Sequence, residues 1–95
     1  MNEVKLTLKD GKEYIFSDVE IGYMRRFRAA AASNDQAGVE SAGLAIITRS
    51  LEQLHPEVTA EVVEMKLVSI ITCDEVLQAA IRASNAGEDR PVAKN

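Results

Sequence analysis

Near the start of the chain, hydrophobic and polar positions alternate, as in a β-strand with one buried face. The alternation over residues 4–8 runs into a Lys-Asp-Gly turn at 9–11, where Gly11 can adopt the positive φ angle of a type I turn with a bulge. A three-residue loop fixes the pairing of the two strands. The pattern therefore predicts a β-hairpin over residues 3–16. The large apolar side chains expected on one face are Val4, Leu6, Tyr14 and Phe16.

Beyond residue 17 the apolar positions recur every three or four residues, which is the spacing of helices with one buried stripe. The Ser-Asp-Val-Glu sequence at 17–20 has the form of a capping box, in which the serine and glutamate side chains bond each other's backbone N–H groups. A polar stretch at 33–35 and Pro56 divide the rest into separate segments. We expect helices over about 18–32, 36–54, 59–71 and 73–84.

The segment 62–71 is apolar on nearly every side, and a small domain can rarely bury every side of one helix. Part of it is therefore expected to contact another protein or a second copy, although the central helix of a core has the same appearance. A second capping-box sequence, Thr-Cys-Asp-Glu at 72–75, leaves open whether 59–84 is one helix or two. The candidate protein-binding residues are Val63, Leu67, Val68 and Ile71.

The chain length allows a single domain with one modest core, because it has only 95 residues. The order of elements predicts an α+β fold, with an N-terminal β-hairpin followed by three to four packed α-helices. We place the domain at residues 1–87. The remaining residues, 88–95, are polar and contain Pro91, and we expect them to form a flexible C-terminal tail.

The charge distribution argues against nucleic acid as a partner, and the short apolar runs argue against a membrane. The net charge is -4, whereas nucleic-acid-binding domains are usually basic. Arg25, Arg26 and Arg28 form a local basic cluster, which we interpret as a solvated helix face. An RNA- or DNA-binding regulator that uses these arginines is the alternative. No apolar run approaches the ~18 residues of a membrane span, and the opening residues lack the apolar core of a signal peptide.

No pattern in the sequence indicates catalysis, a metal or a cofactor. A zinc site needs three or four Cys and His ligands, and His55 and Cys73 are the only residues of those types. The five glycines form no phosphate-binding motif. We interpret His55 as a residue at a helix junction and Cys73 as a small core residue. We therefore predict that the protein is not an enzyme. An enzyme subunit whose shared site uses His55 and Cys73 remains an alternative.

Two stretches of the chain carry a resemblance to a known family. They are VKLTLKDGKEYIFSDVEIGYMRRF at 4–27 and HPEVTAEVVEMKLVSIITCDEVLQAAI at 55–81. A charged, alternating hairpin with an Asp-Gly turn leads directly into a helix, and a Met/Leu segment precedes a last amphipathic helix. This arrangement resembles the small tail assembly chaperones of Mu-like and related tailed bacteriophages.

The resemblance implies a non-catalytic protein in the cytoplasm of a bacterial host. Its partner would be the tape-measure protein or the tail-tube protein, and it could form a homo-oligomer. The family has no catalytic residues, so only surfaces can be carried over to this chain. A longer, frameshifted form is also common in the family. A small prophage-encoded adaptor or regulator that binds one host protein is the alternative function.

Overall fold

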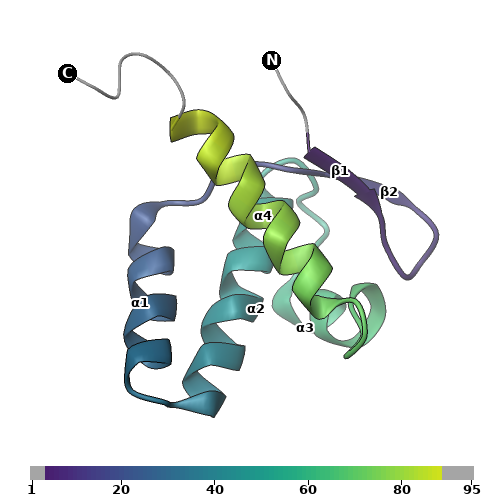
Figure 1. The fold of residues 1–95 in the computed structure, drawn as a ribbon. Helices are drawn as coiled ribbons and strands as arrows, with labels where there is room; N and C mark the ends of the chain where they lie inside the picture. The colour runs from purple at the N-terminus through teal and green to yellow at the C-terminus, as the bar shows by residue number, and fades with distance from the viewer. Residues whose placement is uncertain (1–3, 89–95) are drawn as a thin grey trace.

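The computed structural model describes residues 4–88 and has an α+β fold in which a two-stranded antiparallel hairpin precedes the helices (Figure 1). Residues 1–3 and 89–95, and with them most of the predicted C-terminal tail, lie outside the described residues. The elements are β1 (Val4–Thr7), β2 (Glu13–Phe16), α1 (Ile21–Ala32), α2 (Gln36–Glu52), α3 (Ala60–Val62), the π-helical turn η1 (Val63–Leu67) and α4 (Cys73–Glu88).

The hairpin has the predicted register. Val4 pairs with Phe16, and Leu6 pairs with Tyr14. Gly11 closes the loop with a φ of 84°, and its N–H donates a 2.9 Å hydrogen bond to the carbonyl of Leu8. The face that carries these four apolar side chains packs on the helices, with β1 against α4 and β2 against α2. The hairpin therefore closes one side of the core.

The core lies between the hairpin, α2, the α3–η1 segment and α4, which crosses α2 in Figure 1. In α4, Val76 and Ala80 are buried, whereas Leu77 is only half-buried. The buried hydrophobic residues are Leu8, Tyr14, Phe16, Ile46, Ile47, Leu51, Val58, Val63, Leu67, Val76, Ala79 and Ala80.

Helix α1 lies at the edge of this core and packs along α2. It contains no fully buried residue, and Tyr23 and Phe27 on its apolar side are only half-buried. The polar break at 33–35 reverses the chain as expected. Asn34 adopts a φ of 56°, and the Asp35 carboxylate accepts a 3.0 Å hydrogen bond from the N–H of Gly38 at the start of α2. These contacts fix the α1–α2 turn.

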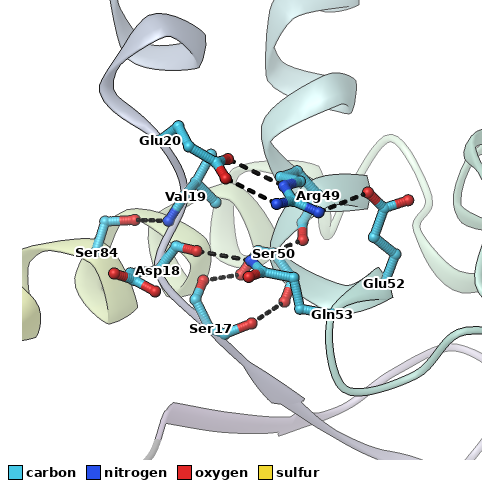
Figure 2. Close-up of polar contacts among 9 residues, drawn as sticks. All are labelled: Ser17, Asp18, Val19, Glu20, Arg49, Ser50, Glu52, Gln53 and Ser84. Atoms are coloured by element: carbon cyan, nitrogen blue, oxygen red, sulfur yellow. Dashed lines mark hydrogen bonds and ion pairs between the residues drawn. The ribbon is translucent and has the colours of Figure 1, made fainter.

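The capping box predicted at 17–20 is wrong, and α1 begins at Ile21. The Ser17 side chain is used elsewhere, because its hydroxyl donates a 2.8 Å hydrogen bond to the carbonyl of Ser50 (Figure 2). The N–H of Ser17 donates to the same carbonyl at 3.0 Å, and the fully buried Ser50 hydroxyl donates to the Ser17 carbonyl at 2.7 Å. These three bonds join the end of β2 to α2.

The rest of the segment between β2 and α1 is held by side chains of two helices (Figure 2). The N–H of Val19 donates to the Ser84 hydroxyl of α4 at 3.1 Å. The Glu20 carboxylate accepts two hydrogen bonds from the Arg49 guanidinium of α2, at 2.7 and 3.0 Å. This pairing lowers the pKa of Glu20 from 4.5 to about 2. The direction in which the hairpin enters α1 is thus set by α2 and α4.

The helix predicted over 59–71 is also wrong in extent, because the helical conformation ends at Leu67. The helix begins close to the predicted start, with Thr59 as the cap of α3, but Val68 is extended and residues 70–72 form a turn. The Ser69 N–H donates to the Thr72 hydroxyl at 3.0 Å, and the Thr72 N–H donates to the Ser69 hydroxyl at 3.3 Å. Such local side-chain bonds compete with a helix, as do β-branched residues. Residues 59–84 therefore contain separate helical segments.

Two predicted helix ends differ from the structure by a few residues. Helix α2 ends at Glu52, two residues before the predicted end. Helix α4 continues to Glu88, four residues past its predicted end at 84 and through the Asn-Ala-Gly sequence at 85–87. A glycine near a helix end costs at most about 1 kcal/mol, so Gly87 alone does not stop the helix.

We predict that Gly11→Val lowers the free energy of unfolding by about 1–3 kcal/mol, because a β-branched residue tolerates a positive φ poorly. Gly22→Ala is the control: Gly22 lies in α1 with a helical φ and no atom within 4 Å of an added Cβ. It should raise stability by up to about 1 kcal/mol. Urea unfolding measures both changes. Equal stability of the two variants would contradict the turn geometry.

We expect Ser50→Ala to destabilise the protein by about 1–3 kcal/mol, because it removes the buried hydroxyl that donates to the half-buried Ser17 carbonyl. Ser41→Ala is a matched change on an exposed position of the same helix, and it should be nearly neutral. The comparison is made by thermal and urea unfolding. A neutral Ser50→Ala would mean that this bond does not hold the hairpin to α2.

The Glu20–Arg49 pair should make stability depend on pH in the acidic range. Because folding lowers the pKa of Glu20 from 4.5 to about 2, its stabilising effect is present above about pH 4.5 and is lost as pH falls toward 2. The stability difference between wild type and Glu20→Gln should therefore disappear over that range. It should also shrink with added salt, because Glu20 is more than half exposed. Glu13→Gln, at an exposed position with no ion pair within residues 4–88, should show neither effect.

Candidate protein-binding groove

An open groove of about 630 Å³ lies between α2, the loop at 68–72 and the start of α4, with α1 along one side. Half-buried and buried side chains from these separate parts of the chain make its floor apolar. Pockets that bind ligands usually have such apolar linings with a few polar groups at the edge. The main apolar residues of the floor are Phe27, Val39, Leu44, Ile47, Val68 and Leu77.

Gly43 lies at the centre of the floor, where α1, α2 and α4 meet. A Cβ added there would lie 3.6 Å from the Leu77 side chain and 3.7 Å from the Phe27 ring, which are ordinary contact distances. Close helix packing therefore does not demand glycine at this position. Because Gly43 has no side chain, the groove is deeper between Phe27 and Leu77.

The loop at 68–72 carries two adjacent isoleucines that are almost fully exposed. Ile70 is 95% exposed and lines the groove, and the neighbouring Ile71 is 92% exposed. The Ser69–Thr72 hydrogen bonds hold the turn that presents them. Single exposed hydrophobic residues are common in proteins, but adjacent ones beside an apolar groove are typical of an interaction surface.

The four candidate residues from the sequence fall into two groups. Val63 is 0% exposed and Leu67 is 2% exposed, so both belong to the core. Val68 is half-buried and lines the groove, whereas Ile71 is in the exposed loop. Ile70, which is the most exposed of the large hydrophobic residues, was not among the candidates. The Ser-x-x-Thr spacing at 69–72 is the sequence signal for the turn.

The rim of the groove is acidic. Glu40 of α2, Glu64 of η1 and Asp74 of α4 are exposed and line its edge. Within residues 4–88, no lysine, arginine or histidine lines the groove, and none of these three carboxylates forms an ion pair. Glu40 accepts only a long hydrogen bond, at 3.4 Å, from the Gln36 amide. The groove thus combines an apolar floor with uncompensated negative charge.

His55 and Cys73 have separate surroundings. His55 Nε2 accepts a 3.1 Å hydrogen bond from the N–H of Ile15, and its ring packs edge-on against Tyr14 with 4.9 Å between ring centres. His55 thus joins the end of α2 to β2, as its position at a helix junction indicates. Cys73 was expected in the core, but it is the first residue of α4, is exposed and lines the groove. Residues 4–88 contain no group of three or more His, Cys, Asp or Glu side chains that could hold a metal.

Tyr14 has a structural partner in the hairpin loop. Its hydroxyl donates a 2.6 Å hydrogen bond to the Asp10 carboxylate. Burial and this bond raise the pKa of Tyr14 to about 12, and the same bond lowers the pKa of Asp10. The pair therefore stabilises the loop with the tyrosine protonated and the aspartate charged.

The three arginines of α1 are exposed, and the Arg26 guanidinium lies 5.8 Å from the centre of the Tyr23 ring. None of them lines the groove. Among the described residues, no helix has both the length and the apolar character needed to cross a membrane.

Comparison of the chain with protein-family models, curated protein sequences and solved structures gives no match. The functional argument therefore rests on the geometry of the groove and on the residues that surround it.

Proposed function

We propose that this protein is a non-catalytic protein-binding module, and that its partner contacts the groove and the two isoleucines beside it. The observation that carries the proposal is the exposure of Ile70 and Ile71 at the edge of an apolar floor. Covering such side chains yields roughly 25 cal/mol per Å² of apolar surface, less the cost of association. Val68 and Ile71, two of the residues expected to bind protein, are part of this surface.

The specific function that we propose is that of a phage or prophage tail assembly chaperone, with the tape-measure protein as partner. The resemblance of residues 4–27 and 55–81 to that family supports it. A tape-measure protein is long and helical, and an apolar groove can bind a helix through its hydrophobic stripe. In this role the protein acts in the bacterial cytoplasm and keeps the partner soluble until tail-tube subunits assemble around it.

The alternative is a small prophage-encoded adaptor that binds one folded host protein. The two functions differ in stoichiometry, because an adaptor would bind one-to-one, whereas a chaperone of a long helical protein would bind in several copies. The neighbouring genes also distinguish them. A tape-measure gene directly downstream and a tail-tube gene upstream would support the chaperone function.

We predict that, if a tape-measure gene lies directly downstream, Ile70→Ser with Ile71→Ser abolishes co-purification of its product after co-expression of the two proteins. Both side chains are over nine-tenths exposed, so the melting temperature of the double variant should change little. Ile21→Ser with Leu54→Ser is the matched control. These residues are 62% and 55% exposed and do not line the groove, so this variant should still bind.

Two outcomes would count against the proposal. If the Ile70/Ile71 variant retains the tape-measure protein as well as wild type does, the loop and groove are not the binding surface. If wild type fails to solubilise the tape-measure protein and instead forms a one-to-one complex with a folded host protein, the adaptor function replaces the chaperone function.

A further inference from the structure

We infer that the groove selects α-helices whose hydrophobic stripe is bordered by lysine or arginine. This inference rests on the proposed function, since it assumes that the groove binds protein, and adds the chemistry by which it distinguishes one helix from another. The inference concerns the charged rim, whereas the proposed function depends on the apolar floor and the two isoleucines. Selection by charge and binding of protein can therefore be tested separately.

Three carboxylates from three different elements carry the inference. Glu40, Glu64 and Asp74 border an apolar floor, and within the described residues the groove lining contains no positive charge to balance them. A helix docked by its apolar stripe brings the residues that flank that stripe against the rim. Basic flanks would meet unpaired carboxylates there, whereas acidic flanks would be repelled. Charge arranged in this way mainly determines which partner binds and how fast.

A helix of another protein fits this surface better than a second copy does. The exposed face of α1 has the required charge in Arg25, Arg26 and Arg28. However, its one large, mostly exposed apolar side chain is Ile21, and the remaining exposed positions of that helix are alanine or glycine. Small side chains would leave the floor uncovered, and the two isoleucines of the loop would stay in water.

The test uses the full chain and two designed helical peptides of about 18 residues, or about five turns. Both peptides carry the same leucine stripe, flanked by lysine in one and by glutamate in the other. Binding is measured by fluorescence anisotropy at low and high salt. One protein variant neutralises the rim with Glu40→Gln, Glu64→Gln and Asp74→Asn. A control variant removes the same charge at three exposed carboxylates outside the groove, with Glu13→Gln, Glu57→Gln and Glu61→Gln.

We expect the lysine-flanked peptide to bind wild type at least 10-fold more tightly than the glutamate-flanked one, because up to three exposed ion pairs distinguish them. The rim variant should lose roughly that 10-fold preference, high salt should reduce it, and the control variant should retain it. Loss of binding by the Ile70/Ile71 variant would confirm that the peptide occupies the groove.

Other outcomes overturn the inference in distinguishable ways. If both peptides bind wild type equally and the Ile70/Ile71 variant binds neither, the groove binds helices but the rim does not select them. If the control variant loses as much preference as the rim variant, the effect is that of net charge alone. If neither peptide binds, the hypothesis that the groove binds helices is wrong, and the inference about its rim is wrong with it. Concentration-dependent dimerisation that the rim variant abolishes would identify the occupant as a second copy.

Discussion

Ser17 and Ser50 exchange hydrogen bonds at the point where the hairpin meets α2, and this junction holds the end of β2 against the helices. Ser50 is fully buried, so each polar group at this point must find a partner inside the protein. With the end of β2 fixed there, the apolar face of the hairpin lies on α2 and α4. A two-stranded hairpin is marginal in water, and these bonds together with that packing make it part of the domain.

The same junction determines where α1 lies. No residue of α1 is fully buried, whereas α2 contributes five buried residues. Helix α1 packs along α2 through half-buried side chains. Its position follows from the fixed segment before it, which Arg49 and Ser84 hold through Glu20 and Val19, and from the capped turn after it. The side of the groove that Phe27 forms is therefore set by polar contacts at both ends of α1 together with its packing along α2.

The sequence predicted the hairpin register correctly, but it missed the local turn at 69–72 and the contacts between residues far apart in the chain. The hairpin register follows from alternation and from Gly11, and the structure confirms it. The sequence at 17–20 matches a capping box, but a buried serine 33 residues away binds Ser17 instead. A capping-box motif considers only neighbouring residues, so it cannot show that Ser50 will bind Ser17 instead. The groove was missed for a similar reason. Its floor is formed by separate parts of the chain, and the apolar residues of each part have the spacing of ordinary core residues.

The loop at 68–72 shows why an apolar run need not be buried. Val63 and Leu67 complete the core, and η1 ends directly after them. Further helix would turn Ile70 or Ile71 toward a core that is already closed by the hairpin, whose Lys9 N–H bonds the Leu67 carbonyl at 3.2 Å. The Ser69–Thr72 bonds then form a turn that leaves both isoleucines in water. Exposing them gives up the stabilisation that burial would provide, and a binding partner would restore it. The end of the core therefore creates the surface on which the proposed function depends.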